Sequence, residues 1–154
     1  MQYRVREADM INQYMIKQYR IFSCIKCGRC VSSCPIARSG EAYSPMVIVE
    51  KALLDLNILE DKDTWLCFTC QACLNRCPSD VKFSEFIEAV RNIAKKEKIT
   101  SKYLSCGRCG RIFTTKPIIE YVKKLVMEKQ LNEEFLTLCP NCRKHALLEK
   151  WRYT

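Results

Sequence analysis

The hydrophobic pattern of the middle of the chain is helical. After residue 82, apolar residues recur at intervals of three and four, which predicts an amphipathic helix; they are Phe83, Phe86, Ile87, Val90, Ile93 and Ala94. Another helix is expected from Ser44, a suitable N-cap, with Pro45 in its first turn. Its apolar side is expected to hold Val49, Leu53, Leu56, Ile58 and Leu59. Nothing between residues 24 and 98 alternates apolar and polar as a half-buried strand does, so this zone is predicted to be helical.

The two ends of the chain carry weaker patterns. Residues 1–23 form a loosely helical arm, expected to cover the domain's own core rather than to dock on a partner; its apolar positions are Val5, Met10, Ile11, Tyr14, Met15 and Ile16. A helix is expected after Lys116–Pro117, with Ile118, Ile119, Val122, Leu125 and Val126 on its apolar side. Short strands are expected at residues 103–104 and 112–113. These patterns divide the chain near residue 100.

Cysteine is the residue that changes this picture most. The chain holds 12 cysteines among 154 residues, and every one lies within four residues of another. The opening sequence MQYRVREADMINQ lacks the apolar stretch of a signal peptide, which favours a cytoplasmic protein, where thiols stay reduced. Metal ligation is therefore favoured over disulfides. No apolar run reaches the roughly 20 residues that span a bilayer, so direct membrane insertion is not expected.

Eight of the cysteines form two copies of one motif, C-x-x-C-x-x-C-x-x-x-C-P, at residues 24–35 and 67–78. A [4Fe-4S] cluster needs four thiolates, and three cysteines at this spacing wrap one loop around three irons. In two-cluster proteins with this motif, the fourth cysteine ligates the other cluster. Two zinc sites are the disfavoured alternative, because zinc sites are usually built from pairs of cysteines. The expected ligand sets are Cys24, Cys27, Cys30 and Cys77 for one cluster, and Cys67, Cys70, Cys73 and Cys34 for the other.

Three other features near these motifs are singled out. Gly28, inside the first loop, is expected either to allow a close backbone approach or positive φ, or to be an ordinary turn glycine. The second loop has no glycine. Trp65 is expected to pack beside a cluster and limit water access. Pro35 and Pro78 turn the chain away after each fourth cysteine.

The segments CIKCGRCVSSCP, SPMVIVEKALLDLNIL and DTWLCFTCQACLNRCPSDVKFSEFIEAVRNIAKKE together resemble the C subunit of heterodisulfide reductase. The resemblance covers about residues 20–98 and implies an α-helical ferredoxin domain. It also implies a cytoplasmic complex in which this subunit relays electrons between a flavin subunit and a catalytic subunit with CCG motifs. This chain has no consecutive cysteines and no CCG motif, so no catalytic residue is assigned to it. The C-terminal zone is not associated with the standard subunit.

Several other functions stay open at this stage. Related dicluster subunits act in methylene-tetrahydrofolate reductases and in lactate or glycerol-3-phosphate oxidation, and the added C-terminal zone favours such a variant. A scaffold protein with structural metals and a free ferredoxin-like carrier are further alternatives. The chain has no G-x-G-x-x-G nucleotide motif.

The last four cysteines, Cys106, Cys109, Cys139 and Cys142, form two knuckles that resemble a zinc ribbon. Four thiolates make a closed, structural zinc site, which disfavours catalysis. Zinc is preferred to a rubredoxin-like iron, because no glycine follows Cys142. Such a site would fold a small domain, and a role as a docking platform stays open beside it. His145, the single histidine, is expected at the surface.

The net charge of +9 at first suggests nucleic-acid binding. Each four-thiolate centre, however, brings a charge of about −2, which leaves the metal-loaded chain near roughly +3. Basic residues are also scattered along the chain, so no nucleic-acid partner is predicted. The expected architecture is mainly α: an N-terminal helical arm (1–23), an α-helical ferredoxin domain with two clusters (24–98), and a zinc-ribbon-like α+β domain (99–154).

Overall fold

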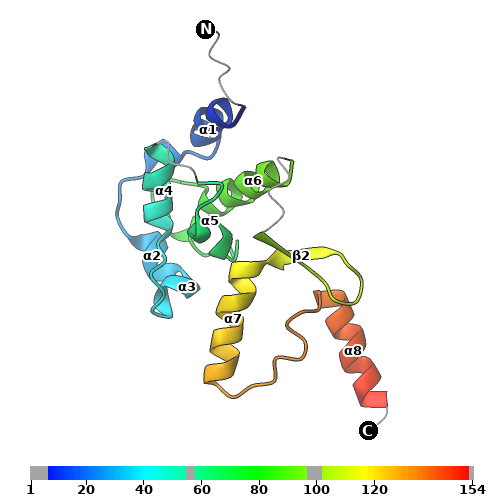
Figure 1. Cartoon of the computed structure of the whole chain (residues 1–154). Helices are drawn as coiled ribbons and strands as arrows, with labels where there is room; N and C mark the ends of the chain where they lie inside the picture. Colours follow the sequence, from blue (N-terminus) through cyan, green and yellow to red (C-terminus); the bar gives the residue numbers. More distant parts are fainter. Residues whose placement is uncertain (1–6, 55–57, 97–101, 153–154) are drawn as a thin grey trace. The chain divides into compact units, whose positions relative to one another are not determined.

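The computed structural model describes residues 7–54, 58–96 and 102–152 of the chain (Figure 1). The chain divides into two compact units, residues 1–98 and 99–154. The helical patterning and the small sheet expected near the C-terminus are both present, so the mainly α fold class is confirmed. Val5 and Leu56 lie outside the described residues, as do the side chains of Met10 and Ile11.

The first unit is built from helices, and its described residues contain no strand. The longer helices are α1 (Glu7–Gln18), α4 (Pro45–Leu53) and α6 (Phe83–Lys96). Short helical turns lie between them: η1 (Ile21–Ser23), α2 (Arg29–Ser33), α3 (Pro35–Arg38), α5 (Lys62–Leu66) and η2 (Leu74–Arg76). The cysteine runs coincide with these short turns, so the long helices frame the cysteines without containing them.

Helix α6 supplies much of the core of the first unit. Its predicted apolar face is the buried face, and Phe86, Ile87 and Ala94 have no exposed surface. Helix α4 begins as expected: the Ser44 side chain accepts a hydrogen bond from the Val47 N–H, and Pro45 occupies the first turn.

The predicted face of α4 is partly wrong. Leu53 is 42% exposed, whereas Ile48 and Ala52 are fully buried beside Val49. The helix ends at Leu53, and its buried stripe runs from Pro45 through positions three, four and seven further on. The prediction placed this stripe one residue too far along. Ile58 is buried beyond the end of the helix.

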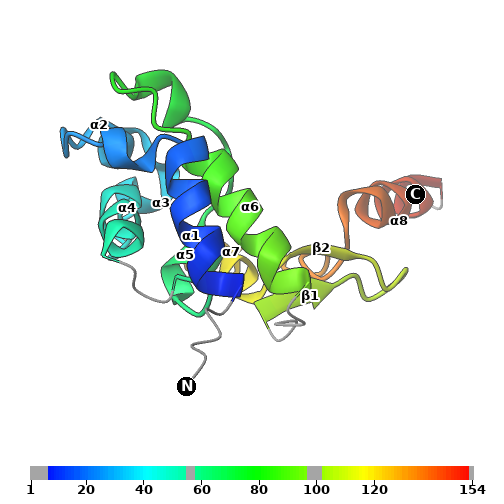
Figure 2. The same ribbon diagram turned by 90° about the horizontal axis from the view of Figure 1, so that it is seen from above.

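The N-terminal arm packs on its own unit. Figure 2 shows α1 next to α6, and the rings of Tyr19 and Phe86 meet edge to face at 6.1 Å. The Tyr19 carbonyl accepts a hydrogen bond from the Lys82 N–H at 3.0 Å. Met15 and Ile21 are buried, while Tyr14 is 70% exposed. This part of the arm therefore covers the core.

The second unit contains a two-stranded antiparallel sheet and two helices. Strand β1 (Tyr103–Ser105) pairs with β2 (Ile112–Thr115), with Tyr103 opposite Thr115. Helix α7 (Lys116–Glu128) follows β2 directly, has Pro117 in its first turn and buries Tyr121. Helix α8 (Pro140–Arg152) was not predicted, because its apolar residues do not recur at helical intervals. No described helix is long and apolar enough to cross a membrane.

Candidate metal centres

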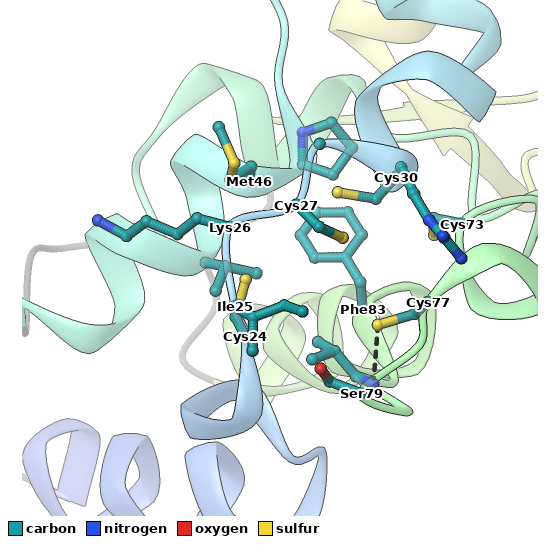
Figure 3. Close-up of a pocket in the computed structure, with 15 residues that line it drawn as sticks. Cys24, Ile25, Lys26, Cys27, Cys30, Met46, Cys73, Cys77, Ser79 and Phe83 are labelled. Atoms are coloured by element: carbon teal, nitrogen blue, oxygen red, sulfur yellow. Dashed lines mark hydrogen bonds between the residues drawn. The ribbon is translucent and has the colours of Figure 1, made fainter.

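One cavity of the first unit brings together cysteines from both runs (Figure 3). Cys24, Cys27 and Cys30 from the first run line it together with Cys73 and Cys77 from the second. Cys24 directly follows η1, and Cys30 lies in the first turn of α2, so the loop between these two turns presents all three sulfurs. The apolar side chains of the wall are Ile25, Pro45, Met46, Val49, Val81 and Phe83.

A second cavity shows the reciprocal arrangement. Cys34 from the first run lines it together with Cys67, Cys70 and Cys73 from the second. The fourth cysteine of each run thus lies with the first three cysteines of the other run. Three residues line both cavities and separate them: Pro45, Cys73 and Phe83.

The two cysteine loops share one backbone path. Lys26 and Gly28 of the first loop have φ of 53° and 75°, and Thr69 and Gln71 stand at the same places in the second loop with 49° and 62°. Gly28 therefore has the positive φ that was one of its two expected roles. Left-handed residues at the third and fifth positions curl each loop, which turns its three cysteines toward one cavity.

Backbone donors and burial shape the electrostatics of the cavities. The Val81 N–H donates to Cys77 Sγ (the dashed line in Figure 3), and the Thr69 N–H donates to Cys67 Sγ, both at 3.3 Å. Burial raises the pKa of the Cys30 and Cys67 thiols, and that of Cys73 to about 12. Buried thiols deprotonate when a metal centre compensates their charge. The paired sulfurs, the N–H donors and the apolar walls therefore fit clusters.

The two cavities differ in how deeply their sulfurs lie. Cys34, Cys67 and Cys73 are buried, whereas Cys24 and Cys77 are half-buried. Each run has one exposed cysteine at the same place, Cys27 in the first and Cys70 in the second. Each cavity therefore has one edge that reaches solvent.

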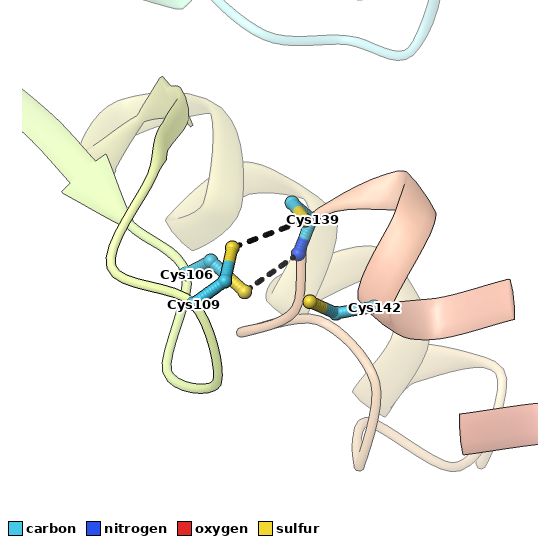
Figure 4. A group of neighbouring side chains, drawn as sticks. All are labelled: Cys106, Cys109, Cys139 and Cys142. Atoms are coloured by element: carbon cyan, nitrogen blue, oxygen red, sulfur yellow. Dashed lines mark hydrogen bonds between the residues drawn. The ribbon is translucent and has the colours of Figure 1, made fainter. Parts of the chain in front are cut away.

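The four remaining cysteines converge in the second unit (Figure 4). Cys106 follows β1 and Cys139 precedes α8, and the sulfurs of Cys106, Cys109, Cys139 and Cys142 all lie within 4.8 Å of one another. The Cys109 and Cys139 sulfurs are 3.7 Å apart. Metal–sulfur bonds of about 2.3 Å at the corners of a tetrahedron give sulfur separations of about 3.8 Å. The group therefore has the dimensions of a four-thiolate site for one metal ion.

Hydrogen bonds prepare this four-cysteine group. The Cys139 N–H donates to Cys106 Sγ at 3.3 Å and, as the largest cause, lowers the pKa of the Cys106 thiol to about 6. Burial raises the pKa of Cys142 to about 12. The Gly110 N–H donates to the Cys106 carbonyl at 2.9 Å and closes the first knuckle. Without metal the group holds both thiolate and thiol, and a divalent ion would draw all four into the thiolate form.

Two expectations about single residues have different outcomes. His145 is exposed, as predicted. Trp65 is fully buried but lines neither cysteine cavity, so the expectation that it packs beside a cluster is wrong. Its Nε1 donates to the Leu59 carbonyl at 2.7 Å. An indole N–H needs a buried acceptor, and this one ties Trp65 to the turn before α5.

Sequence reasoning missed three residues near the second cavity. Arg91 on α6 donates to the Thr64 and Cys67 carbonyls, at 2.7 and 2.8 Å, and fastens the second loop to the core. Tyr43 and Ser84 line the second cavity and are buried. Arg91 lies beside the predicted apolar face of α6, and its partners are carbonyls, which no side-chain pattern reveals. Tyr43 stands just before the predicted N-cap Ser44, which was its one signal.

Comparison with known proteins defines the class. Residues 20–81 match a family model described as a 4Fe-4S dicluster domain. The chain is 40% identical over 90 residues to a protein of Methanococcus maripaludis, the C2 subunit of H(2)/formate:CoB-CoM heterodisulfide,ferredoxin reductase. That alignment covers 53% of this chain and 48% of the relative. It is also 44% identical over 78 residues to the second iron-sulfur C subunit of CoB–CoM heterodisulfide reductase from Methanocaldococcus jannaschii, covering 50% and 41%.

The chain thus contains a 4Fe-4S dicluster domain and has homologues named as C subunits of heterodisulfide reductase, as the sequence motifs indicated. It spans about half, or less, of the length of these relatives. Another relative aligns more fully: the C subunit of a ferredoxin/F(420)H(2)-dependent CoB-CoM heterodisulfide reductase from Methanosarcina acetivorans. It is 27% identical over 148 residues, covering 84% of this chain and 90% of its own length. An alignment of that extent reaches into the second unit, so the C-terminal zone has a counterpart in at least this relative.

Proposed function

We propose that this chain is an iron–sulfur electron-transfer subunit of a multi-subunit, cytoplasmic oxidoreductase of the heterodisulfide reductase type. The observation that carries the proposal is the reciprocal arrangement of cysteines in the two cavities. It supports Cys24, Cys27, Cys30 and Cys77 as ligands of one [4Fe-4S] cluster, and Cys67, Cys70, Cys73 and Cys34 as ligands of the other. The dicluster family match and the names of the homologues support it independently.

The residues of this chain would bind and insulate the clusters rather than react. Bound clusters supply one-electron oxidation and reduction. The curled loops hold the sulfurs, and the apolar walls exclude water. Pro45, Cys73 and Phe83 would provide the short path between the two sites, because they line both cavities. The solvent edges at Cys27 and Cys70 would be the points where electrons enter and leave.

The partners would be a flavin-containing subunit and a catalytic subunit of the CCG or another type. A groove between the two cysteine runs offers a surface for one of them. It is lined by Arg29, Arg38 and Arg76 together with Ser32, Ser33, Ala72 and Asn75, and no acidic side chain is among these lining residues. Three arginines without an acidic neighbour in the groove favour a partner surface rich in carboxylates.

The four-cysteine group of the second unit would hold zinc, with iron as the alternative. Its four protein sulfurs leave no open coordination position, which favours a structural role. Zinc would stabilise a unit whose core is small: Tyr103, Cys106, Thr115, Tyr121 and Cys139 are its buried residues among those described. Holding a partner subunit on this rigid unit is a second proposed role.

Anaerobic purification followed by metal counting tests the ligand assignment. About eight irons and one zinc per chain are expected from these ligand sets. Cys109→Ser should remove the zinc and keep the irons, while Cys27→Ser should change iron content or cluster spectra and keep the zinc. Four irons or fewer in fully reconstituted protein would overturn the dicluster assignment.

Isolation of the native complex tests the subunit role. Co-purification with a flavin protein and a catalytic subunit is expected, and a chain that elutes alone would be a free carrier instead. Redox titration followed by EPR separates electron transfer from scaffolding, since structural clusters would not be reduced at accessible potentials.

A further inference from the structure

The two cysteine cavities differ at one corresponding position. Tyr43 and Val81 each stand two residues before the first residue of a long helix, Pro45 of α4 and Phe83 of α6. Tyr43 lines the second cavity and Val81 lines the first. The second cavity therefore has a phenol hydroxyl at a place where the first has only methyl groups.

Two buried hydroxyls line the second cavity and have no hydrogen-bond partner among the described residues. Tyr43 is 3% exposed and Ser84 is 2% exposed. The Tyr43 Oη and the Ser84 Oγ each make no hydrogen bond of standard geometry to the described polypeptide. Leaving a buried hydroxyl unpaired is destabilising, and such groups are rare in folded proteins. Two of them facing one cavity indicate that an acceptor belongs in that cavity.

The Tyr43 hydroxyl is a permanent donor placed near a cluster ligand. Burial, followed by the nearby Cys67 thiol, raises the pKa of Tyr43 far above its usual value, so the hydroxyl keeps its proton. Burial raises the pKa of Cys67, and the Thr69 N–H and the Tyr43 hydroxyl act in the opposite direction. The Tyr43 hydroxyl is thus close enough to Cys67 to interact with its sulfur.

We propose that Tyr43 and Ser84 donate O–H···S hydrogen bonds to the sulfur atoms of the second centre and raise its reduction potential. The proposal rests on the cluster assignment above. Each cluster takes up one electron without making or breaking a covalent bond, and its reduced form carries one more negative charge. Donors to the sulfurs stabilise the more negative form. Cys34, Cys67 and Cys73 are buried, and burial alone would lower the potential of this centre. The two hydroxyls counteract that effect.

The test is a redox titration of the reconstituted full-length protein, followed by EPR, in Tyr43→Phe and Ser84→Ala variants. Tyr43→Phe removes the hydroxyl and keeps the ring. At a fixed potential, we expect it to lower the reduced-to-oxidised ratio of one centre by roughly three- to tenfold, where tenfold corresponds to about 59 mV for one electron. Ser84→Ala should shift the same centre in the same direction, and the other centre should not move.

Thr64→Val is the matched control. Thr64 is fully buried and its Oγ1 has no hydrogen-bond partner among the described residues, but Thr64 lines neither cavity. Its potentials should equal those of the unmodified protein. Cys70→Ser and Cys27→Ser assign the signals, because these exposed cysteines hold the same place in the two loops. The signal that moves in Tyr43→Phe should be the one altered by Cys70→Ser.

Three results would overturn the proposal: unchanged potentials in both hydroxyl variants at full iron content, an equal shift in Thr64→Val, or a shift confined to the signal altered by Cys27→Ser. Iron counting of the unmodified protein comes first. A count of four irons or fewer would overturn the cluster assignment itself. A full count without a shift would overturn only the role of the hydroxyls.

Discussion

Gly28 and Gln71 hold the same place in the two cysteine loops, and both adopt left-handed backbone, with φ of 75° and 62°. Glycine adopts this conformation freely, whereas for a residue with a Cβ it costs about 1 kcal/mol or more. The second loop therefore keeps its shape against a local conformational preference that the first loop does not oppose. Since the two paths match, the ligand arrangement and not the local sequence determines the shape of the loop.

Replacing Gln71 by glycine is predicted to stabilise the protein. The substitution removes the cost of the left-handed conformation, and the Gln71 side chain is exposed, so few contacts are lost. We expect a gain of up to about 1 kcal/mol in the free energy of unfolding, reduced by the greater freedom of glycine in the unfolded chain. Anaerobic denaturant titration of the cluster-loaded protein measures it.

Gly28→Ala is the converse substitution. A Cβ at Gly28 would meet no atom within 4 Å, so its cost is the backbone conformation alone. We expect a loss of about 1 kcal/mol. Equal effects of the same sign in Gln71→Gly and Gly28→Ala would contradict the conformational explanation.

Arg91 is predicted to hold the second cysteine loop in place. Its guanidinium donates to the Thr64 and Cys67 carbonyls and lies 5.9 Å from the centre of the Trp65 ring. Removing a charged donor from buried carbonyls costs about 2–3 kcal/mol. Arg91→Ala should lower the unfolding free energy by that amount and speed iron loss from the second site under a chelator.

Two variants show whether the fork geometry matters. Arg91→Lys keeps the charge but cannot donate to both carbonyls in one plane, so it should recover less than half of the loss. Glu88→Ala, at an exposed position of the same helix, should change stability by less than about 0.5 kcal/mol. An Arg91→Ala protein as stable as Glu88→Ala would show that these hydrogen bonds contribute little.

Much of the candidate site was predictable because metal ligation leaves a strict spacing in the sequence. The cysteine runs, the apolar face of α6 and the capped start of α4 follow local rules of spacing and capping. Trp65 did not follow them: its buried indole N–H found the Leu59 carbonyl, a contact that depends on how the chain turns before α5 and not on the motif. The roles of Arg91 and Tyr43 were missed for a related reason, since their partners are backbone carbonyls and a cavity rather than side chains at a fixed interval.

Asp61 is predicted to stabilise the start of α5 in two separable ways. It caps the helix by accepting a hydrogen bond from the Asp63 N–H at 2.9 Å, and it forms an ion pair with Lys51 on α4. Asp61→Asn should keep most of the cap and lose the ion pair, at a cost of about 1 kcal/mol. Asp61→Ala should lose both, at about 2 kcal/mol. Thermal unfolding under anaerobic conditions compares them.

The pH dependence of this ion pair follows from the pKa shifts. Burial alone would raise the pKa of Asp61, but the hydrogen bonds from Lys51 and from the Asp63 N–H outweigh it and lower the pKa below 3.8. The hydrogen bond with Asp61 raises the pKa of Lys51 above 10.5. The stabilisation is therefore fully present above the unfolded pKa of Asp61 and below that of Lys51. The stability difference between the unmodified protein and Asp61→Asn should stay constant between about pH 6 and 9, and a marked change in that range would contradict the assignment.

The arginine-lined groove is predicted to bind an acidic surface of a partner subunit. Arg38 lines this groove between the cysteine runs, while Lys17 is an exposed residue of α1 that does not line it. Arg38→Glu and Lys17→Glu change the net charge equally, so they separate a local effect from a general one. Because electrostatic contacts mainly set association rates, Arg38→Glu should slow association with the native partner roughly tenfold at low salt, and Lys17→Glu by less than about twofold. Association rates of the purified chain with its co-purified partners at increasing salt measure both effects. Salt should reduce the difference between the two variants as it screens the groove, and equal slowing by both would show that net charge, not the groove, governs the encounter.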